Sequence, residues 1–203
     1  MESTTKMKAG NNHQIIRLFD LLATDGGEHS FEVVANCFKS KNADVELFLR
    51  QKAVQATKLS TAATYLISSY ANKKFDLLGY FTLATKMLTL KQDSLTKTEC
   101  KAISQFGYFD EESKSYKLPA ILIAQFSRNF NTDSNSISGA ELMDIALDKI
   151  RDILHSTSGK TVFLECEQIE PLVKFYIDNG FQPLGNTVLS KNNKELTQLY
   201  IIL

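Results

Sequence analysis

The most regular pattern in the chain is an apolar run that leads through a polar loop into an amphipathic segment. The run Ala120–Arg128 is mostly apolar and of strand length, which predicts a buried central strand. Residues 129–136 are mainly Asn, Ser, Thr and Asp, which are typical of turns. Apolar residues then recur at helical spacing, at Leu142, Ile145, Ala146, Ile150 and Ile153. This order predicts a strand, a loop and a helix that packs on a sheet.

The start of this helix has the signature of a capping box. Ser138 can accept a hydrogen bond from the N–H of Glu141, whose carboxylate can reach back to the N–H of Ser138. Because the first N–H groups of a helix lack helical partners, such a start is also a candidate anion site, and Gly139 has no Cβ to obstruct a phosphate. The alternative is a capped helix that binds nothing.

The N-terminal part predicts three strands and a helix. The run Gln14–Ala23 is interpreted as a first strand, with a short helix as the alternative. A helix with Asp44 as its N-cap is expected next. The β-rich runs Thr61–Ser69 and Leu77–Thr85, separated by a turn at 73–76, are expected to form an antiparallel pair.

Residues 86–117 are longer than a simple connection and are interpreted as an inserted helix and loop. Thr96 and Glu99 form a second capping box, which predicts a short helix to about Phe106 that ends at Gly107. The acidic and aromatic run 108–112 is then expected to be an exposed loop. It either lines a site or is a surface elaboration that contacts no ligand.

The last third predicts a strand, a helix and a hairpin. The strand is Thr161–Cys166, and the helix has Pro171 in its first turn and Gly180 at its C-terminal end. Phe181–Leu189 and Leu196–Leu203 form the hairpin. Parallel and antiparallel pairings are therefore mixed, which predicts an α/β or α+β layered fold.

Composition narrows the class of protein without naming a function. The chain has 203 residues, 43% hydrophobic and 23% charged, which fits one globular domain over 13–203 behind a polar tail at 1–12. The formal net charge is zero, so the chain lacks the strongly basic composition of many nucleic-acid-binding proteins. No apolar run is long enough to cross a bilayer, and three cysteines without metal-like pairing indicate reduced thiols and a cytoplasmic protein.

Two motifs in this order resemble the GCN5-related N-acetyltransferase (GNAT) superfamily. Residues 175–181 read FYIDNGF and match the family's F-Y-x-x-x-G-F helix after its fifth strand, and residues 78–83 read LGYFTL, similar to a strand of one bacterial branch. That branch includes the acetyltransferase toxins of toxin–antitoxin pairs. The resemblance spans roughly Phe38 to Leu203. It implies a mixed central sheet of about six to seven strands with flanking helices, splayed between the fourth and fifth strands.

The chain departs from the family at its pyrophosphate loop. The family pattern is Gln/Arg-x-x-Gly-x-Gly/Ala, whereas residues 134–139 read SNSISG and keep only the second glycine. No Lys or Arg occurs between Arg128 and Lys149, and Asp133 and Glu141 would oppose a diphosphate. Either the loop binds acetyl-CoA through backbone N–H groups and hydroxyls, which is the preferred interpretation, or the cofactor site has decayed.

The resemblance implies acetyl-CoA as co-substrate and assigns residues to it. The pantetheine arm would pair with the family's fourth strand at Phe126, Ser127 and Arg128. The diphosphate would lie over the loop and the helix start, at Ser134, Ser136, Ile137, Ser138, Gly139 and Ala140.

The same resemblance assigns the chemistry. Tyr176 corresponds to the family's general acid for the departing thiolate; the alternative is a core aromatic residue with a satisfied hydroxyl. Glu165 is the candidate general base, with Glu167 on the other side of Cys166, although both carboxylates could simply be solvated at a strand end. A covalent acetyl intermediate on Cys166 is a minor alternative.

The expected activity is direct acetyl transfer to an amine in a ternary complex. The alternatives are a non-catalytic acyl-CoA-binding or partner-binding module, and a toxin that acetylates aminoacyl-tRNA. An antitoxin and a homodimer are possible protein partners, and no membrane partner is expected. The three histidines lack the spacing of metal ligands, so no metal is expected.

Overall fold

The computed structural model describes residues 13–71, 74–131, 137–190 and 193–203. Within these residues, eight strands form one mixed sheet in the order β1-β2-β3-β5-β6-β8-β7, with β4 attached to β5. The strands are β1 His13–Arg17, β2 Ala63–Ala71, β3 Lys74–Lys91, β4 Tyr108–Asp110, β5 Ser115–Arg128, β6 Thr161–Glu167, β7 Gln182–Leu189 and β8 Glu195–Ile202. The helices are α1 Leu18–Leu22, α2 Gly27–Asn36, α3 Ala43–Gln51, α4 Ala53–Lys58, α5 Lys97–Ile103, α6 Gly139–Ser156 and α7 Glu170–Asp178, with a 3-10 turn, η1, at Gln92–Ser94. The expectation of a mixed sheet with flanking helices is confirmed.

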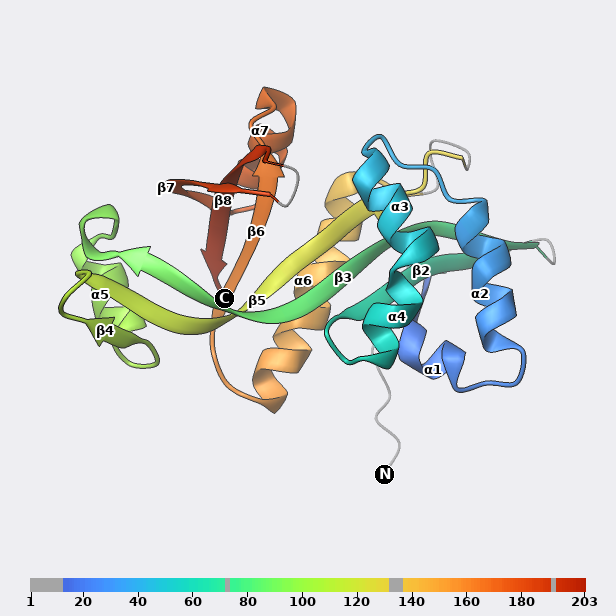
Figure 1. The fold of residues 1–203 in the computed structure, drawn as a ribbon, viewed down its shortest axis with the longest axis horizontal. Coiled ribbons are helices and arrows are strands. Elements are labelled where there is room, and N and C mark those ends of the chain that lie inside the picture. Colours follow the sequence, from blue (N-terminus) through green and yellow to red (C-terminus); the bar gives the residue numbers. More distant parts are fainter. Residues whose placement is uncertain (1–12, 72–73, 132–136, 191–192) are drawn as a thin grey trace.

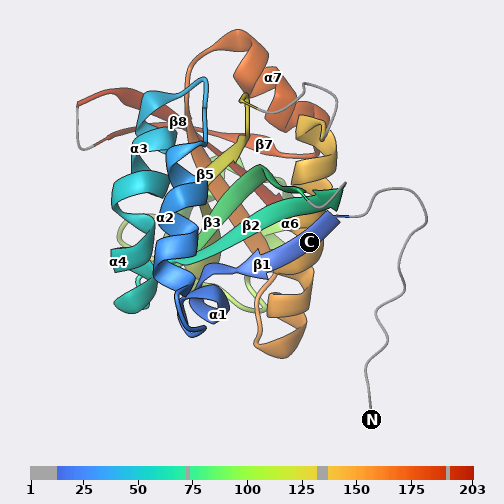
Figure 2. The same cartoon turned by 90° about the vertical axis from the view of Figure 1, so that its right-hand side faces the viewer.

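Helices cover both faces of the sheet (Figures 1 and 2). On one face α6 and α7 pack on the central strands, and Leu142, Ala146 and Ile150 are fully buried there, as the helical spacing predicts. On the other face α1 to α4 cover β1 to β3 around a second cluster that contains Phe31, Phe38, Leu49 and Tyr80. Because side chains alternate along a strand, neighbouring residues of the central strands enter opposite layers.

The central strands β5 and β6 separate after a short parallel contact. Their register pairs only Ile121 with Val162, Leu122 with Phe163 and Ile123 with Leu164. Beyond these pairs β6 rises steeply away from β5 and carries β8 and β7 with it (Figure 1). β4 lies off the main path of the sheet. When it is left out of the count, β5 and β6 are the fourth and fifth strands of the predicted sheet. The predicted splay is therefore confirmed at this position.

Residues 86–117 are not simply an inserted helix and loop. β3 runs for 18 residues to Lys91, and β5 begins at Ser115, so the two strands continue as a long ribbon that projects from the sheet (Figure 1). The predicted capping box at Thr96 and Glu99 is present and begins α5. Residues 108–110 of the run expected to be an exposed loop form β4, which pairs with β5 and places Phe109 against Tyr116 with ring centroids 4.8 Å apart. Backbone pairing along the ribbon thus overrides the turn-like composition.

Three local expectations near the N-terminus need correction. The strand expected over Gln14–Ala23 ends at Arg17, and α1 follows because Leu18, Leu21 and Leu22 share a helical face against the second cluster. The N-cap of α3 is Asn42, whose side chain accepts from the N–H of Asp44 at 2.9 Å, so Asp44 lies inside the first turn. The turn expected at 73–76 is mostly strand, since β3 begins at Lys74.

The remaining terminal elements match their predictions. β6, α7 and the β7–β8 hairpin occupy the expected segments, and Gly180 adopts φ +89 after the end of α7, a conformation that favours glycine. The tail at 1–12 lies outside the described residues. No helix in the described part of the chain is both long and apolar enough to span a bilayer.

Candidate active site

A pocket of about 370 Å³ lies where β5 and β6 separate. Five parts of the chain contribute to its walls: the N-cap and first turn of α3, residues 122–126 of β5, residues 164–167 of β6, two residues of α7, and the β7–β8 hairpin. The lining residues are Asn42, Asp44, Val45, Leu122, Ile123, Ala124, Gln125, Phe126, Leu164, Glu165, Cys166, Glu167, Leu172, Tyr176, Ser190, Lys194 and Leu196. We call this cavity the wedge pocket.

Tyr176 lines the wedge pocket as a buried residue packed between aromatic rings. Its side chain is 7% exposed, and its ring makes edge contacts with Phe175 and Phe181 at centroid distances of 5.2 and 6.0 Å. The Tyr176 hydroxyl has no hydrogen-bond partner among the described residues. It is nevertheless not fully enclosed, because its oxygen is not among the buried polar atoms without a partner. The hydroxyl therefore opens into the pocket. Burial raises the pKa of the Tyr176 phenol, with a further contribution from the nearby Cys166.

Glu165 and Glu167 reach the same pocket with different partners. The Oε1 atom of Glu165 accepts a hydrogen bond from Nε2 of Gln198 at 2.8 Å. Glu167 is paired with Lys194, whose Nζ lies 3.0 Å from Oε1. Because Glu167 is already engaged by a cation, Glu165 is the better placed of the two to accept a proton.

The pocket passes through the plane of the sheet. Leu164 and Cys166 belong to the core on the α6–α7 side, so Glu165 between them points to the α3 side. Tyr176 belongs to the α6–α7 side. The proposed acid and base therefore approach the pocket from opposite faces, which is possible only because β5 and β6 have parted.

Cys166 is an unfavourable nucleophile. Its thiol is 6% exposed, and burial raises its pKa to about 11, with the Glu167 carboxylate adding to the shift. A thiol in this environment is protonated at neutral pH, whereas nucleophilic cysteines need a thiolate.

The start of α6 forms as predicted, but part of its anion-binding capacity is used internally. The N–H of Ser138 donates to Oε2 of Glu141 at 2.8 Å, and the N–H of Glu141 donates to Oγ of Ser138 at 3.1 Å. Packing also favours glycine at position 139, because a Cβ there would lie 3.1 Å from the Phe175 ring. The N–H groups of Gly139 and Ala140 have no partner among the described residues and remain as donors.

The predicted strand residues lie near this helix start. Arg128 donates from Nη1 to the carbonyl of Ile137 at 3.4 Å and stacks on Phe130 at 4.7 Å. Oγ of Ser127 donates to the carbonyl of Arg128 at 2.7 Å and lies 3.0 Å from Oγ of Ser40. The predicted loop residues Ser134 and Ser136 lie outside the described residues.

Aromatic contacts connect the helix start with the wedge pocket. The Phe126 ring, in the pocket wall, lies 6.1 Å from that of Phe175, which in turn covers Gly139. Packed aromatic rings thus link the predicted strand and the helix start to the helix that carries Tyr176.

Sequence reasoning missed several residues of this pocket. Asn42, Asp44 and Lys194 come from α3 and from the hairpin, far apart in the chain, and no local signal joins them. Gln125 did carry a signal, since it is a polar residue inside the apolar run of β5. Its carboxamide oxygen is buried without a partner among the described residues.

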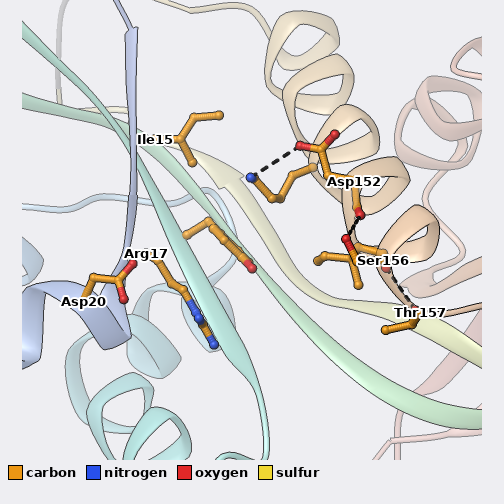
Figure 3. A pocket seen from close by; sticks show the side chains of 9 residues that line it. Ile15, Arg17, Asp20, Asp152, Ser156 and Thr157 are labelled. Carbon is orange, nitrogen blue, oxygen red and sulfur yellow. Dashed lines mark hydrogen bonds and ion pairs between the residues drawn. The ribbon is translucent and has the colours of Figure 1, made fainter. Parts of the chain in front are cut away.

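A second, larger pocket lies between the sheet and the C-terminal half of α6 (Figure 3). Its volume is about 460 Å³, and its walls include Arg17, Asp20 and Tyr65. Several of its polar groups are engaged locally: Lys149 pairs with Asp152 at 3.5 Å, and Thr157 donates to the carbonyl of Ile153 at 2.9 Å. It contains none of the residues that the sequence assigns to chemistry. The wedge pocket is therefore the candidate active site despite its smaller size.

The described residues contain no group of three His, Cys, Asp or Glu side chains arranged to hold a metal ion. The expectation that the protein uses no metal stays a prediction.

Comparison with known proteins identifies the fold. No protein-family model and no curated protein matches the sequence. Among solved structures, AtaT complexed with acetyl-methionyl-tRNAfMet superimposes with a TM-score of 0.64 at 17% identity, covering 94% of each chain. A mutant of KacT gives 0.63 at 17% identity, covering 92% of this chain and 94% of that one.

The chain shares its fold with AtaT, which is a toxin, and with KacT. AtaTR bound with AcCoA is a further match, with a TM-score of 0.57 at 17% identity and coverage of 94% and 93%. At such low identity the likeness establishes the architecture alone. The fold implied by the GNAT resemblance is confirmed, including the mixed sheet and its opening at the wedge pocket.

Proposed function

We propose that this protein is an acetyl-CoA-dependent N-acetyltransferase that transfers the acetyl group directly to an amine in the wedge pocket. The observation that carries the proposal is the opening between β5 and β6, which presents the Tyr176 hydroxyl to a cavity of about 370 Å³. A protein of the same fold is bound with AcCoA. Solved structures of this fold include tyrosine-to-phenylalanine mutants of AtaT and KacT.

The open edge of β5 can hold an extended ligand. Beyond Ile123 this edge has no pairing with β6, so the peptide groups of Ala124 to Phe126 face the wedge pocket. Unpaired strand edges readily pair with an added extended chain, such as a pantetheine arm. The N–H groups of Gly139 and Ala140, beside the Arg128 side chain, would face the diphosphate.

The chain's own residues then move two protons. Acetyl-CoA supplies a thioester carbonyl carbon to which the amine nitrogen can bond. Glu165 accepts the proton of the attacking amine, directly or through water, as the C–N bond forms. Tyr176 donates its proton to the thiolate as the C–S bond breaks. Burial raises the pKa of Tyr176, so the phenol is protonated at neutral pH; the same shift makes it a weaker acid than a solvent-exposed tyrosine.

Two measurements test this proposal. Isothermal titration with acetyl-CoA should show saturable binding, and free thiol should be released when an amine is added. Binding without thiol release from any amine would favour the alternative of a non-catalytic acyl-CoA-binding module. Absence of binding at millimolar acetyl-CoA would contradict both.

A second candidate is a toxin that acetylates aminoacyl-tRNA. It is favoured by the shared fold with AtaT complexed with acetyl-methionyl-tRNAfMet. Growth arrest on expression, relieved by Tyr176→Phe, together with acetylation of charged tRNA, would support it. Related structures include AtaT bound to the C-terminus of the antitoxin AtaR, so an antitoxin is a reasonable partner to seek. A homodimer and a cytoplasmic location stay predictions.

A further inference from the structure

The pocket of Figure 3 is a groove between the edge of the sheet and the C-terminal half of α6. It shares no lining residue with the wedge pocket, so the proposed acetyl transfer gives it no role. We call it the edge groove. Its sheet wall contains Ile15, Arg17 and Tyr65, and its helix wall contains Lys149, Asp152 and Ile153.

Two hydrogen-bond donors stand together on the sheet wall. Arg17 and Tyr65 are directly paired residues of β1 and β2, so their side chains are neighbours on one face of the sheet. Tyr65 is 7% exposed, and its hydroxyl has no hydrogen-bond partner among the described residues. The hydroxyl is not fully enclosed, because its oxygen is not among the buried polar atoms without a partner. A ligand in the edge groove can therefore reach it.

The Arg17 guanidinium keeps its N–H groups available. Its Cζ atom lies 5.1 Å from the centroid of the Phe19 ring, a contact that uses one face of the planar group. Among the described residues, no hydrogen bond or ion pair engages the guanidinium N–H groups. A guanidinium beside a hydroxyl matches the two oxygens of a carboxylate, which arginine binds in a bidentate geometry.

The other charges around the edge groove favour a ligand with a single negative charge. Lys149 is paired with Asp152 at 3.5 Å, so these two residues add no net charge. Asp20 also lines the groove and makes no ion pair with Arg17 among the described residues. The helix wall is the C-terminal part of α6, where the helix dipole places partial negative charge. A phosphate dianion would therefore meet more repulsion here than a carboxylate.

The remaining surface of the edge groove suits an apolar group. Ile15 is 44% exposed on the sheet wall, and Ile153 lines the helix wall. The hydroxyls of Ser156 and Thr157 donate to the carbonyls of Asp152 and Ile153 at 2.9 Å each, so they are used within the helix end. Between its polar ends, the groove thus offers apolar contact to the body of a ligand.

We propose that the edge groove binds an organic monocarboxylate with an apolar body. The carboxylate accepts hydrogen bonds from the guanidinium of Arg17 and from the hydroxyl of Tyr65, and the apolar body lies between Ile15 and Ile153. Binding gives the Tyr65 hydroxyl the acceptor that the described residues do not supply. The site is separate from the wedge pocket, so it does not depend on the proposed acetyl transfer.

The experiment compares three probes that share a phenyl ring and differ in their polar group. Amide NMR titrations of the full chain give Kd for phenylacetate, phenylacetamide and phenyl phosphate, with and without acetyl-CoA. Phenylacetate should bind about tenfold more tightly than its neutral amide, because the amide cannot form charge-assisted hydrogen bonds as an acceptor. It should also bind about threefold or more tightly than phenyl phosphate. Acetyl-CoA should leave Kd for phenylacetate unchanged.

Two variants locate the carboxylate. Arg17→Gln should raise Kd for phenylacetate by about tenfold or more, since the charge and the paired donors are both lost. Tyr65→Phe should raise Kd about fivefold and leave the free energy of unfolding nearly unchanged, because its hydroxyl has no protein partner and its ring still stacks on Phe81. Arg151→Gln and Tyr70→Phe are the matched controls outside the groove, and each should keep Kd within about twofold.

The possible results are distinct. No saturable shift with millimolar phenylacetate would overturn the site. Equal Kd for phenylacetate and phenylacetamide, or tighter binding of phenyl phosphate, would overturn the monocarboxylate as its ligand. Competition with acetyl-CoA, or an unchanged Kd in both Arg17→Gln and Tyr65→Phe relative to their controls, would place the ligand elsewhere and overturn the edge groove as its site. Binding of phenylacetate by a chain that does not bind acetyl-CoA would support the site and contradict the proposed acetyl transfer alone.

Discussion

Replacing Tyr176 by phenylalanine tests the chemistry with the least disturbance to the fold. The change removes one hydroxyl that opens into the wedge pocket and has no partner among the described residues. Because no hydrogen bond is lost, the free energy of unfolding should change by less than about 1 kcal/mol. A general acid typically contributes 10² to 10⁴ to the rate, so kcat should fall by roughly that factor.

A second buried tyrosine provides the matched control. Tyr200 is 4% exposed, and its hydroxyl donates to Oε1 of Glu99 at 2.9 Å, on the ribbon side of the sheet and outside the wedge pocket. Tyr200→Phe leaves the Glu99 carboxylate with one donor fewer, so it should cost about 1 to 3 kcal/mol of stability. Its kcat should remain close to that of the wild type.

The assay measures both quantities for both variants. Thiol release at saturating acetyl-CoA and acceptor gives kcat, and urea unfolding gives the free energy of unfolding. The reasoning predicts opposite patterns: lost rate with kept stability at Tyr176, and lost stability with kept rate at Tyr200. If Tyr176→Phe keeps kcat within about threefold of the wild type, the phenol is not the general acid, whatever happens to Tyr200.

Other predictions follow from single contacts. Ser138→Ala removes the acceptor for the N–H of Glu141, so urea unfolding should show a loss of about 1 kcal/mol; no loss would mean that the capping box is not formed in solution. Gly79→Ala places a Cβ 3.0 Å from Leu142 and from the carbonyl of Ser127, and a thermal melt should reveal about 1 to 3 kcal/mol of destabilisation, whereas a stabilised variant would contradict this close packing. Burial raises the pKa of the phenols of Tyr80, Tyr176 and Tyr200, so these groups favour the folded state below about pH 10, and their contribution is lost as the pH rises above that. Urea titrations at pH 8, 10 and 11 should therefore show falling stability, and a flat profile would show that these tyrosines are not enclosed.

The predictions from sequence succeeded where one local interaction dominates. The start of α6 depends on Ser138 and Glu141, three residues apart, and its buried face depends on a spacing of three and four residues. The start of α5 is the same kind of case. The sequence also predicts the order of strands and helices in the last third of the chain. Pro171 and Gly180 mark the two ends of α7 there.

The predictions fail where the local structure depends on contacts with residues that are distant in the chain. The long ribbon of β3 and β5 exists because each strand supplies the other's hydrogen bonds from Gly79 to Lys91, which composition cannot show. Leu18 is helical because the second core cluster encloses it. The sequence favours glycine at position 139 for access by a phosphate, whereas the structure shows that packing against Phe175 also requires it.

The amino-acid sequence by itself determined which helices begin where, which faces are apolar, and which tyrosine stands in a family-like motif, since these properties depend on neighbours a few residues away. Only the tertiary structure decided that β5 and β6 part after Ile123, and that Asp44, Gln125, Glu165 and Tyr176 then surround one cavity. The physical reason is that a cavity is a property of packing between elements. Its charge and shape depend on strand separation and on side chains that meet across long stretches of chain.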